Sequence, residues 1–450
     1  MRRWLTVLGT LTVSLPPLAA LLLHACGYTA RIEVVRSFYR ETQFVAANKC
    51  GTDANTIDLL YLLLTGDDVL MTDTDPLLAQ RVDGGASPVN VQFPEAFSVA
   101  RILGPCAASP MPACAGGGTC VDGFCQMSES VTVEPTVAST RFVQVTRKGT
   151  GRAVALLMDN SSSLNGDDEN GGPRFNVTDP GDRRISGAQD FVSNAKAFSE
   201  ADRFTVIAYH GDGTDGVFPK LRSRDDEPPS ASWFVSQREE LKNQLATLKN
   251  EENGKTPLFD AIKVGVDALR SITGSAQRVV VNFSDGPSNS SVATLDEAQT
   301  ALTSARYPFI SVAVSPKLGA GADQLQQLAC LTAPDGKPQG ALVVSSPGPE
   351  LRDKFVQLAY LVTGHWRTTL TLAPRNGSLT AGTTYKLTGR MFADPGAAPK
   401  RCDGIASDGG VGADAGAPQN PTCPASMECE NGAGEFQGRC FVRVKFNYKP

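Results

Sequence analysis

Five oxygen-bearing side chains in three short segments could bind a divalent cation. Residues 159–163 read Asp-Asn-Ser-Ser-Ser, residues 254–262 read Gly-Lys-Thr-Pro-Leu-Phe-Asp-Ala-Ile, and residues 284–286 read Ser-Asp-Gly. Hydroxyl and carboxylate oxygens are the ligands that hard cations such as Mg²⁺ prefer. Asp-x-Ser-x-Ser by itself is a weak signal, expected by composition in about one chain in ten of this length. The candidate metal ligands are Asp159, Ser161, Ser163, Thr256 and Asp285.

Predicted strands and helices place these segments along one edge of a sheet. An apolar run at residues 154–158 ends at the first segment, and a buried-strand pattern at residues 278–283 ends at the third. The second segment opens a helix whose apolar residues repeat at helical spacing from Leu258 to Ile272. Because short strands alternate with helices throughout this part, we expect an α/β fold with a parallel sheet covered on both faces. Ligands bind at the carboxyl edge of such a sheet.

Together, the three segments resemble the metal-ion-dependent adhesion site of von Willebrand factor A domains, and the resemblance covers roughly residues 150–365. It implies a doubly wound, mostly parallel, Rossmann-like sheet. It also implies that the five candidate ligands hold Mg²⁺ or Mn²⁺, and that the cation binds an Asp or Glu carboxylate of a protein partner. The hydroxyl ligands are neutral and the aspartates act partly through water, so the cation stays electron-poor and attracts a carboxylate.

A long stretch at residues 164–184 departs from the common pattern of that family and would lie beside the metal. One interpretation is a loop that selects the partner. Another is a Ca²⁺ site that uses Asp167, Asp168 and Glu169. The third is a solvated acidic loop, which we favour over the Ca²⁺ site because the spacing matches no known calcium loop.

The first residues have the pattern of an export signal. Two arginines precede an apolar stretch at residues 5–23 that is broken by two prolines, as in a signal sequence rather than a spanning helix. It ends in Leu-His-Ala-Cys at residues 23–26, which resembles the lipobox of bacterial lipoproteins. The resemblance implies removal of residues 1–25, lipidation of Cys26 and a membrane anchor of several acyl chains. We expect a cell-envelope protein in the outer membrane of a Gram-negative bacterium; the alternative is an ordinary secretory signal and a secreted protein.

Eleven cysteines occur, so ten remain once Cys26 is set aside, an even number typical of disulfides in an oxidising compartment. Eight form two clusters of four whose pairing the sequence leaves open, and Cys50 and Cys330 would then pair by elimination. No Cys-x-x-Cys motif occurs and histidines are few, so zinc is a poor alternative. The clusters are Cys106, Cys114, Cys120 and Cys125, and Cys402, Cys423, Cys429 and Cys440.

The segments on both sides of the α/β part read as β-rich. Apolar and polar residues alternate there as in half-exposed antiparallel strands, so strands before residue 150 and after residue 367 could pair into one module. An apolar run at residues 57–64 predicts a short helix instead. The expected domains are a signal peptide at 1–25, a cysteine-rich β region at 26–149, the α/β domain with the metal site at 150–365, and a β-rich, disulfide-containing region at 366–450.

Composition limits the classes of partner and activity. The formal net charge is −5 and no basic run occurs, which argues against nucleic acid as a partner. No Gly-x-Ser-x-Gly, His-Glu-x-x-His or phosphate-loop motif occurs either, so we do not expect an enzyme. We expect a protein that binds an acidic protein partner through the metal. The alternative is an envelope scaffold whose α/β domain docks constitutively, and its binding need not depend on metal.

Overall fold

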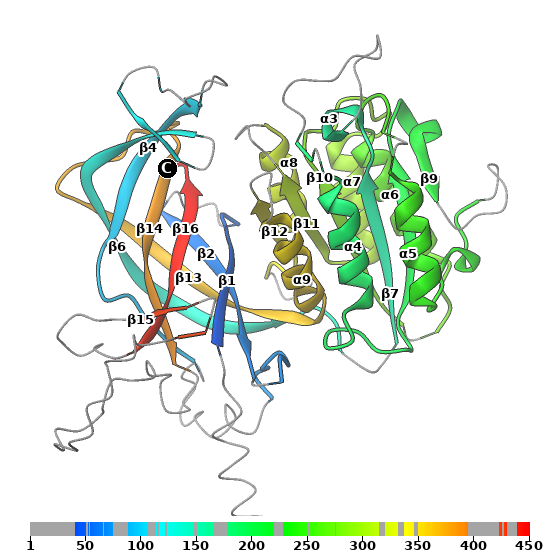
Figure 1. The fold of residues 1–450 in the computed structure, drawn as a ribbon, viewed down its shortest axis with the longest axis horizontal. Coiled ribbons are helices and arrows are strands. Elements are labelled where there is room, and N and C mark those ends of the chain that lie inside the picture. The colour runs from blue at the N-terminus through cyan, green and yellow to red at the C-terminus, as the bar shows by residue number, and fades with distance from the viewer. Residues whose placement is uncertain are drawn as a thin grey trace, which may run out of the picture.

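A computed structural model describes most of the chain from residue 41 onward. Figure 1 shows two parts side by side, a curved antiparallel sheet and an α/β domain. The expected signal peptide, Cys26, Cys402 and the candidate Ca²⁺ ligands Asp167, Asp168 and Glu169 lie outside the described residues. The structure describes residues 41–450 except 51–52, 54, 66, 75–88, 107–113, 115–116, 122–123, 148–150, 166–177, 180, 220–227, 250–251, 275, 315–319, 332–336, 346–349, 395–422, 425–426 and 430–438.

Five parallel strands form the centre of the α/β domain, as the alternating pattern predicts. In sheet order they are β12, β11, β10, β7 and β8, with the short β9 antiparallel at the β8 edge. Their residues are almost all buried, because helices cover both faces, and this explains the continuous apolar runs. The strands are β7 (Arg152–Asp159), β8 (Arg203–Tyr209), β9 (Val217–Pro219), β10 (Gln277–Ser284), β11 (Phe309–Val314) and β12 (Ala341–Ser345).

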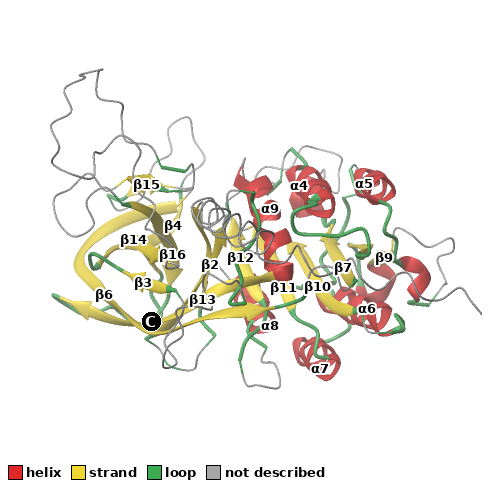
Figure 2. Ribbon diagram, turned by 90° about the horizontal axis from the view of Figure 1, so that it is seen from below, coloured by secondary structure: helices red, strands yellow, loops and turns green. Residues whose placement is uncertain are grey.

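Helices lie on both faces of this sheet (Figure 2). Helices α4, α5 and α9 pack on one face with Leu156 of β7, whereas α6, α7 and α8 pack on the other with Leu157. This arrangement confirms the predicted doubly wound α/β class. No helix of the described residues is long and apolar enough to cross a membrane. The helices are α3 (Ser162–Asn165), α4 (Arg183–Ser193), η1 (Gly213–Gly216), η2 (Ala231–Trp233), α5 (Arg238–Thr247), α6 (Leu258–Arg270), α7 (Leu295–Ala305), α8 (Ala320–Ala329) and α9 (Glu350–Thr363).

Strands from both ends of the chain pair into one antiparallel sheet, which we call the β module. Strands β2 and β6 precede the α/β domain, and both pair with β13, which follows directly after α9. The order is β1-β2-β13-β6-β4-β14-β16-β15, with β3 on β14 and β5 on β6. The strands are β1 (Glu41–Asn48), β2 (Thr56–Leu64), β3 (Asn90–Gln92), β4 (Phe97–Pro105), β5 (Thr119–Val121), β6 (Phe124–Gln144), β13 (Gly364–Arg375), β14 (Tyr385–Asp394), β15 (Glu428–Cys429) and β16 (Cys440–Tyr448).

The predicted helix at residues 57–64 is wrong, because this run forms most of strand β2. All of its residues from Ile57 to Leu64 are buried, and β1 and β13 pair with it on either side. A short, continuous apolar run fits a strand buried on both faces as well as it fits a buried helix, and periodicity does not separate the two. Pairing with β13, which is far away in sequence, decides in favour of the strand.

Four disulfides have both partners among the described residues. The Cys50–Cys330 disulfide joins the segment after β1 to the end of α8, and it therefore links the β module to the α/β domain. Cys429 is also disulfide-bonded. The sulfur atoms of Cys106, Cys114 and Cys125 lie within 4.8 Å of one another, but each belongs to a disulfide and is therefore not a metal ligand. The pairs within the β module are Cys106–Cys120, Cys114–Cys125 and Cys423–Cys440.

The β module is fastened to the α/β domain along strand β12. The side-chain amide of Asn48 donates to the carbonyl of Leu342 over 2.7 Å and accepts from the N–H of Leu342 over 3.0 Å, as a neighbouring strand would. From β13, the guanidinium of Arg367 donates to the carbonyl of Gly340 over 2.8 Å. Together with the interdomain disulfide, these bonds fix the orientation of the two parts.

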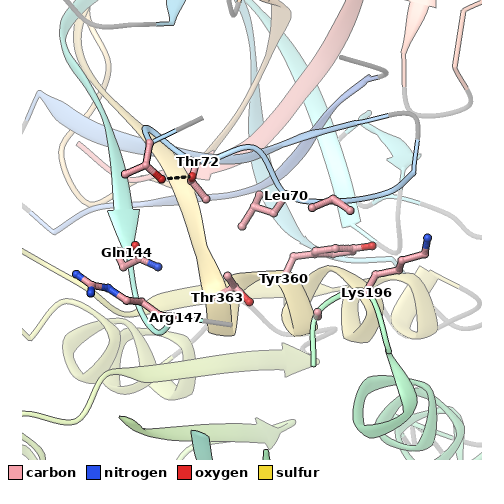
Figure 3. Close-up of a pocket in the computed structure, with 10 residues that line it drawn as sticks. Leu70, Thr72, Gln144, Arg147, Lys196, Tyr360 and Thr363 are labelled. Carbon is pink, nitrogen blue, oxygen red and sulfur yellow. Dashed lines mark hydrogen bonds between the residues drawn. The ribbon is translucent and has the colours of Figure 1, made fainter. Parts of the chain in front are cut away.

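A cavity of about 480 Å³ lies at this junction (Figure 3). Tyr360 and Thr363 of α9 line one wall, Leu70 of the β module lies opposite, and Arg147 and Lys196 stand at its two ends. The hydroxyl of Tyr360 donates to the backbone carbonyl of Asp68, in the segment that follows β2, over 2.8 Å. The cavity is therefore bordered by contacts that hold the two parts together.

His365 is completely buried at the start of β13, beside two arginines. Its Nε2 lies 3.4 Å from the guanidinium of Arg367, and its Nδ1 has no hydrogen-bond partner among the described residues. Burial, and then the positive charges of Arg367 and Arg141, hold the pKa of His365 well below its ordinary value. The imidazole is therefore neutral in the folded protein.

We predict that His365 makes the protein less stable as the pH falls below about 6.5, the ordinary pKa of histidine. The unfolded chain binds a proton there and the folded chain does not, so about 1.4 kcal/mol of unfolding free energy is lost for each further pH unit. Urea unfolding of the wild type and His365→Asn at about pH 7.5 and about pH 5.5 measures this difference. Comparing the two chains cancels the titration of all other groups. Identical pH dependence in both would contradict a neutral, buried imidazole.

Candidate metal centre

The two candidate aspartates lie at the ends of neighbouring parallel strands. Asp159 is the last residue of β7, and Asp285 follows Ser284, the last residue of β10. The two strands pair in register, with Met158 opposite Phe283. The chain continues from β7 to β8 on one side, whereas β10 lies on the other side, so the strand order reverses at this point. Ligands bind at the carboxyl ends of parallel strands at such a reversal.

A series of hydrogen bonds connects the buried Asp159 to the surface. Its carboxylate is completely buried and accepts from the N–H of Ser161 over 2.9 Å and from the hydroxyl of Ser284 over 2.7 Å. The hydroxyls of Ser161 and Ser163 lie 3.0 Å apart, and that of Ser163 donates to Asp285 over 3.0 Å. Ser161 is buried, whereas Ser163 is exposed. Four of the five predicted ligands therefore form one cluster that opens to solvent at Ser163.

Thr256 comes from the second loop and is held beside the first. The carbonyl of Gly254 accepts from both the N–H and the hydroxyl of Ser162, over 3.2 and 2.9 Å. Gly254 has a φ of 58°, and an added Cβ would lie 2.9 Å from Gly211, so the close approach of these loops requires glycine. Asn289 fixes the Thr256 backbone by accepting from its N–H over 2.8 Å. Within the described residues, the Thr256 hydroxyl bonds none of the other four candidates, and what links Thr256 to them is the bonding of its loop to Ser162.

The site is unfavourable for two charged carboxylates. Burial, and then the charge of Asp285, raise the pKa of Asp159 to about 7, although hydrogen bonds lower it in part. Burial also raises the pKa of Asp285, although two hydroxyls and the more distant charge of Arg184 oppose this. Neither carboxylate forms an ion pair within the part of the chain that the structure describes. The negative charge here is therefore poorly balanced, and a bound cation would offset it.

The donor set fits a hard divalent cation. It consists of three hydroxyls and two carboxylates, so every side-chain donor is an oxygen. Mg²⁺ prefers oxygen ligands, keeps several waters and is usually held by one or two carboxylates, which matches the two aspartates. A bound Mg²⁺ or Mn²⁺ would supply positive charge at this position. The exposed hydroxyl of Ser163 marks the side from which a partner could reach it.

Three residues that were not predicted from the sequence support the cluster. Ser284 donates directly to Asp159, and its place at the end of a buried strand is the signal that could have identified it. Asn289 holds the backbone of Thr256. Thr178 donates to Asp285 from the end of the 164–184 insertion, and nothing in its local sequence marks this role. The first two belong to loops that the metal-binding pattern already includes, whereas Thr178 does not.

Comparisons with known proteins extend these observations. Residues 153–346 match the family model of the von Willebrand factor type A domain. A comparison with curated proteins found no match. Similar solved structures include a von Willebrand factor type A protein from Catenulispora acidiphila, with 12% identity, coverage of 66% of this chain and 71% of that chain, and a TM-score of 0.35. Two others are the conserved hypothetical protein BatB from Bacteroides thetaiotaomicron (16% identity, 46% and 98% covered, TM-score 0.29) and an aerotolerance-related membrane protein from Bacteroides fragilis (15%, 46% and 98%, 0.29).

The family match covers the parallel sheet from β7 to β12 and all three loops of the candidate metal centre, and the chain therefore contains a von Willebrand factor type A domain.

Proposed function

We propose that the von Willebrand factor type A domain, hereafter the A domain, binds a protein partner through a divalent cation. Domains of this family generally mediate protein–protein binding. The observation that carries the proposal is a buried carboxylate, Asp159, and a half-buried one, Asp285, which hydroxyl groups link to the exposed Ser163 at the reversal point of the sheet. The ligands would be Asp159, Ser161, Ser163, Thr256 and Asp285, and the cation would be Mg²⁺ or Mn²⁺.

An acidic side chain is the partner group that this site would favour. Neutral hydroxyls provide most of the direct contacts, so they leave the cation's charge largely uncompensated toward solvent. A carboxylate from an Asp or Glu of the partner would complete the coordination. The residues of this chain then only hold and orient. Among the described residues no histidine is hydrogen-bonded to Ser161 or Ser163, and the proposal includes no catalytic step.

We predict that the chain without residues 1–26 binds a single Mn²⁺ or Mg²⁺ ion in calorimetric titration. Asp159→Asn keeps the size of the side chain but removes its charge, and we expect the affinity to fall about 100-fold or more. In EDTA, the same variant should unfold at an equal or higher temperature than the wild type, because it removes a buried charge next to Asp285. This combination separates loss of binding from loss of folding.

Failure of the wild-type chain to bind either ion would contradict the proposal. Equal affinity of the wild type and Asp159→Asn would contradict it as well, because any bound ion would then sit elsewhere. In both cases, a scaffold whose A domain docks without metal becomes the better account. The rigid junction between the A domain and the β module is compatible with such a scaffold.

We further propose that the protein is a lipoprotein of the cell envelope, anchored through Cys26 in the outer membrane of a Gram-negative bacterium. Several disulfides support a location outside the cytoplasm, where oxidising conditions maintain them. The anchor itself rests on the sequence pattern at residues 23–26. The lipid chains would hold the A domain at a membrane surface, where it could meet its partner.

The full chain, produced in a Gram-negative host, should be recovered in the membrane fraction and carry the added mass of acyl chains. Cys26→Ser should be recovered in the soluble fraction without that mass, because the thiol that carries the lipid is absent. A soluble wild-type protein cleaved at another position would contradict the anchor and favour a secreted protein.

A further inference from the structure

The end of the 164–184 insertion folds back onto the first loop of the metal centre. The N–H of Thr178 donates to the carbonyl of Ser163 over 3.1 Å, and the N–H of Asp179 donates to the carbonyl of Leu164 over 2.9 Å. Thr178 and Asp179 are both buried. Residues 178–179 are therefore hydrogen-bonded to residues 163–164, where the insertion begins, and they pack beside the candidate ligands.

Thr178 also contacts the third loop. Its hydroxyl donates to Oδ2 of Asp285, while the hydroxyl of Ser163 donates to Oδ1 of the same carboxylate over 3.0 Å. Asp285 lies one residue beyond the end of β10, where the strand no longer fixes its side chain. The two hydroxyls, one on each oxygen, therefore set the orientation of this carboxylate.

Arg184 connects the same segment to the first loop and to the chain just before the second loop. Its side chain is completely buried, and one of its nitrogens donates to Asp179 over 3.1 Å and to Asp182 over 3.0 Å. The other donates to the side chain of Asn160, between two candidate ligands, over 2.8 Å and to Glu252, just before the second loop. Residues 178–184 thus contact the first and third loops of the candidate metal centre and the segment that leads into the second loop.

We infer that Thr178 is a positioning residue for the cation, and that it acts by holding the carboxylate of Asp285. The inference rests on the proposed function, namely that this site binds a divalent cation. Outer partners that orient metal ligands typically contribute about 10–100-fold to metal affinity. Thr178 lies outside the five residues that the metal-binding pattern contains. The insertion therefore adds to the metal centre of this protein, in addition to any contact that it makes with a partner.

The test is Mn²⁺ titration of the chain without residues 1–26 and of four variants. Thr178→Val removes the hydroxyl at nearly constant shape, and Thr178→Ala removes it with a smaller side chain. We expect both to weaken Mn²⁺ binding about 10–100-fold. Thr178→Ser keeps a hydroxyl and should remain within about threefold of the wild type.

Thr205→Val is the matched control. Thr205 is a completely buried threonine of β8 whose hydroxyl has no hydrogen-bond partner in the part of the chain that the structure describes, so the same substitution there should leave Mn²⁺ affinity unchanged. Thermal unfolding of every chain in EDTA shows whether the metal-free fold is intact. A purely structural role of Thr178 would lower the unfolding temperature of the valine and alanine variants in EDTA.

Wild-type affinity in Thr178→Val and Thr178→Ala would overturn the inference and leave the proposed function intact. Equal weakening in Thr178→Ser and Thr178→Val would overturn it too, because the hydroxyl would then not be the active group. Absence of Mn²⁺ binding by the wild type would overturn the proposed function, and the inference with it. Weak binding by the valine and alanine variants, near-normal binding by serine and unchanged unfolding in EDTA would support the inference.

Discussion

A buried carboxylate, Asp159, and a half-buried one, Asp285, lie at the ends of neighbouring parallel strands, and the loops of the A domain are arranged around this constraint. Burial raises the pKa of Asp159 and of Asp285, so both charges are unfavourable in the folded chain. Hydroxyl and backbone N–H donors surround them, from Ser284, Ser163 and Thr178 among others, and no cationic side chain of the described residues is in direct contact with them. Such donors lower the free-energy penalty of the ionised carboxylates, but they do not neutralise the negative charge. The position is consequently suited to a small, hard cation.

The fold sets this position through the strand order rather than through local sequence. β7 and β10 are adjacent because the chain reverses direction across the sheet between β8 and β10, so two loops distant in sequence converge at one edge. The β module is attached elsewhere, along β12 and near the end of α8. Among the described residues, these contacts between the two parts lie outside the loops of the candidate metal centre. A partner could engage the A domain while the β module holds it in one orientation.

The convergence of the three candidate metal-binding loops could be predicted because each loop adjoins a recognisable element. Asp159 and Asp285 follow buried apolar runs, and Thr256 precedes a helix with a clear apolar stripe. Contacts that depend on tertiary folding could not be predicted in this way. Thr178 becomes part of the site only because the insertion returns to Leu164, and no local pattern indicates that return.

In the β module, too, local sequence does not predict contacts between distant segments. Strand β2 has no periodicity that distinguishes it from a buried helix, and its pairing with β13 spans most of the chain. Cys120 and Cys125 lie opposite each other in the β5–β6 pair, yet each forms its disulfide with a cysteine outside that pair. Spacing alone therefore does not give the connectivity, whereas Cys50 and Cys330 could be matched because the other cysteines fall into two clusters.

Anomalous diffraction from crystals of the chain grown with Mn²⁺ would show directly whether a cation binds at this cluster of hydroxyls and carboxylates. We predict one strong anomalous peak between the hydroxyls of Ser161 and Ser163, at about 2.1 Å from each, with Asp285 still bonded to Thr178. A peak at another position, or none at these hydroxyls at an ion concentration that saturates the protein, would contradict it.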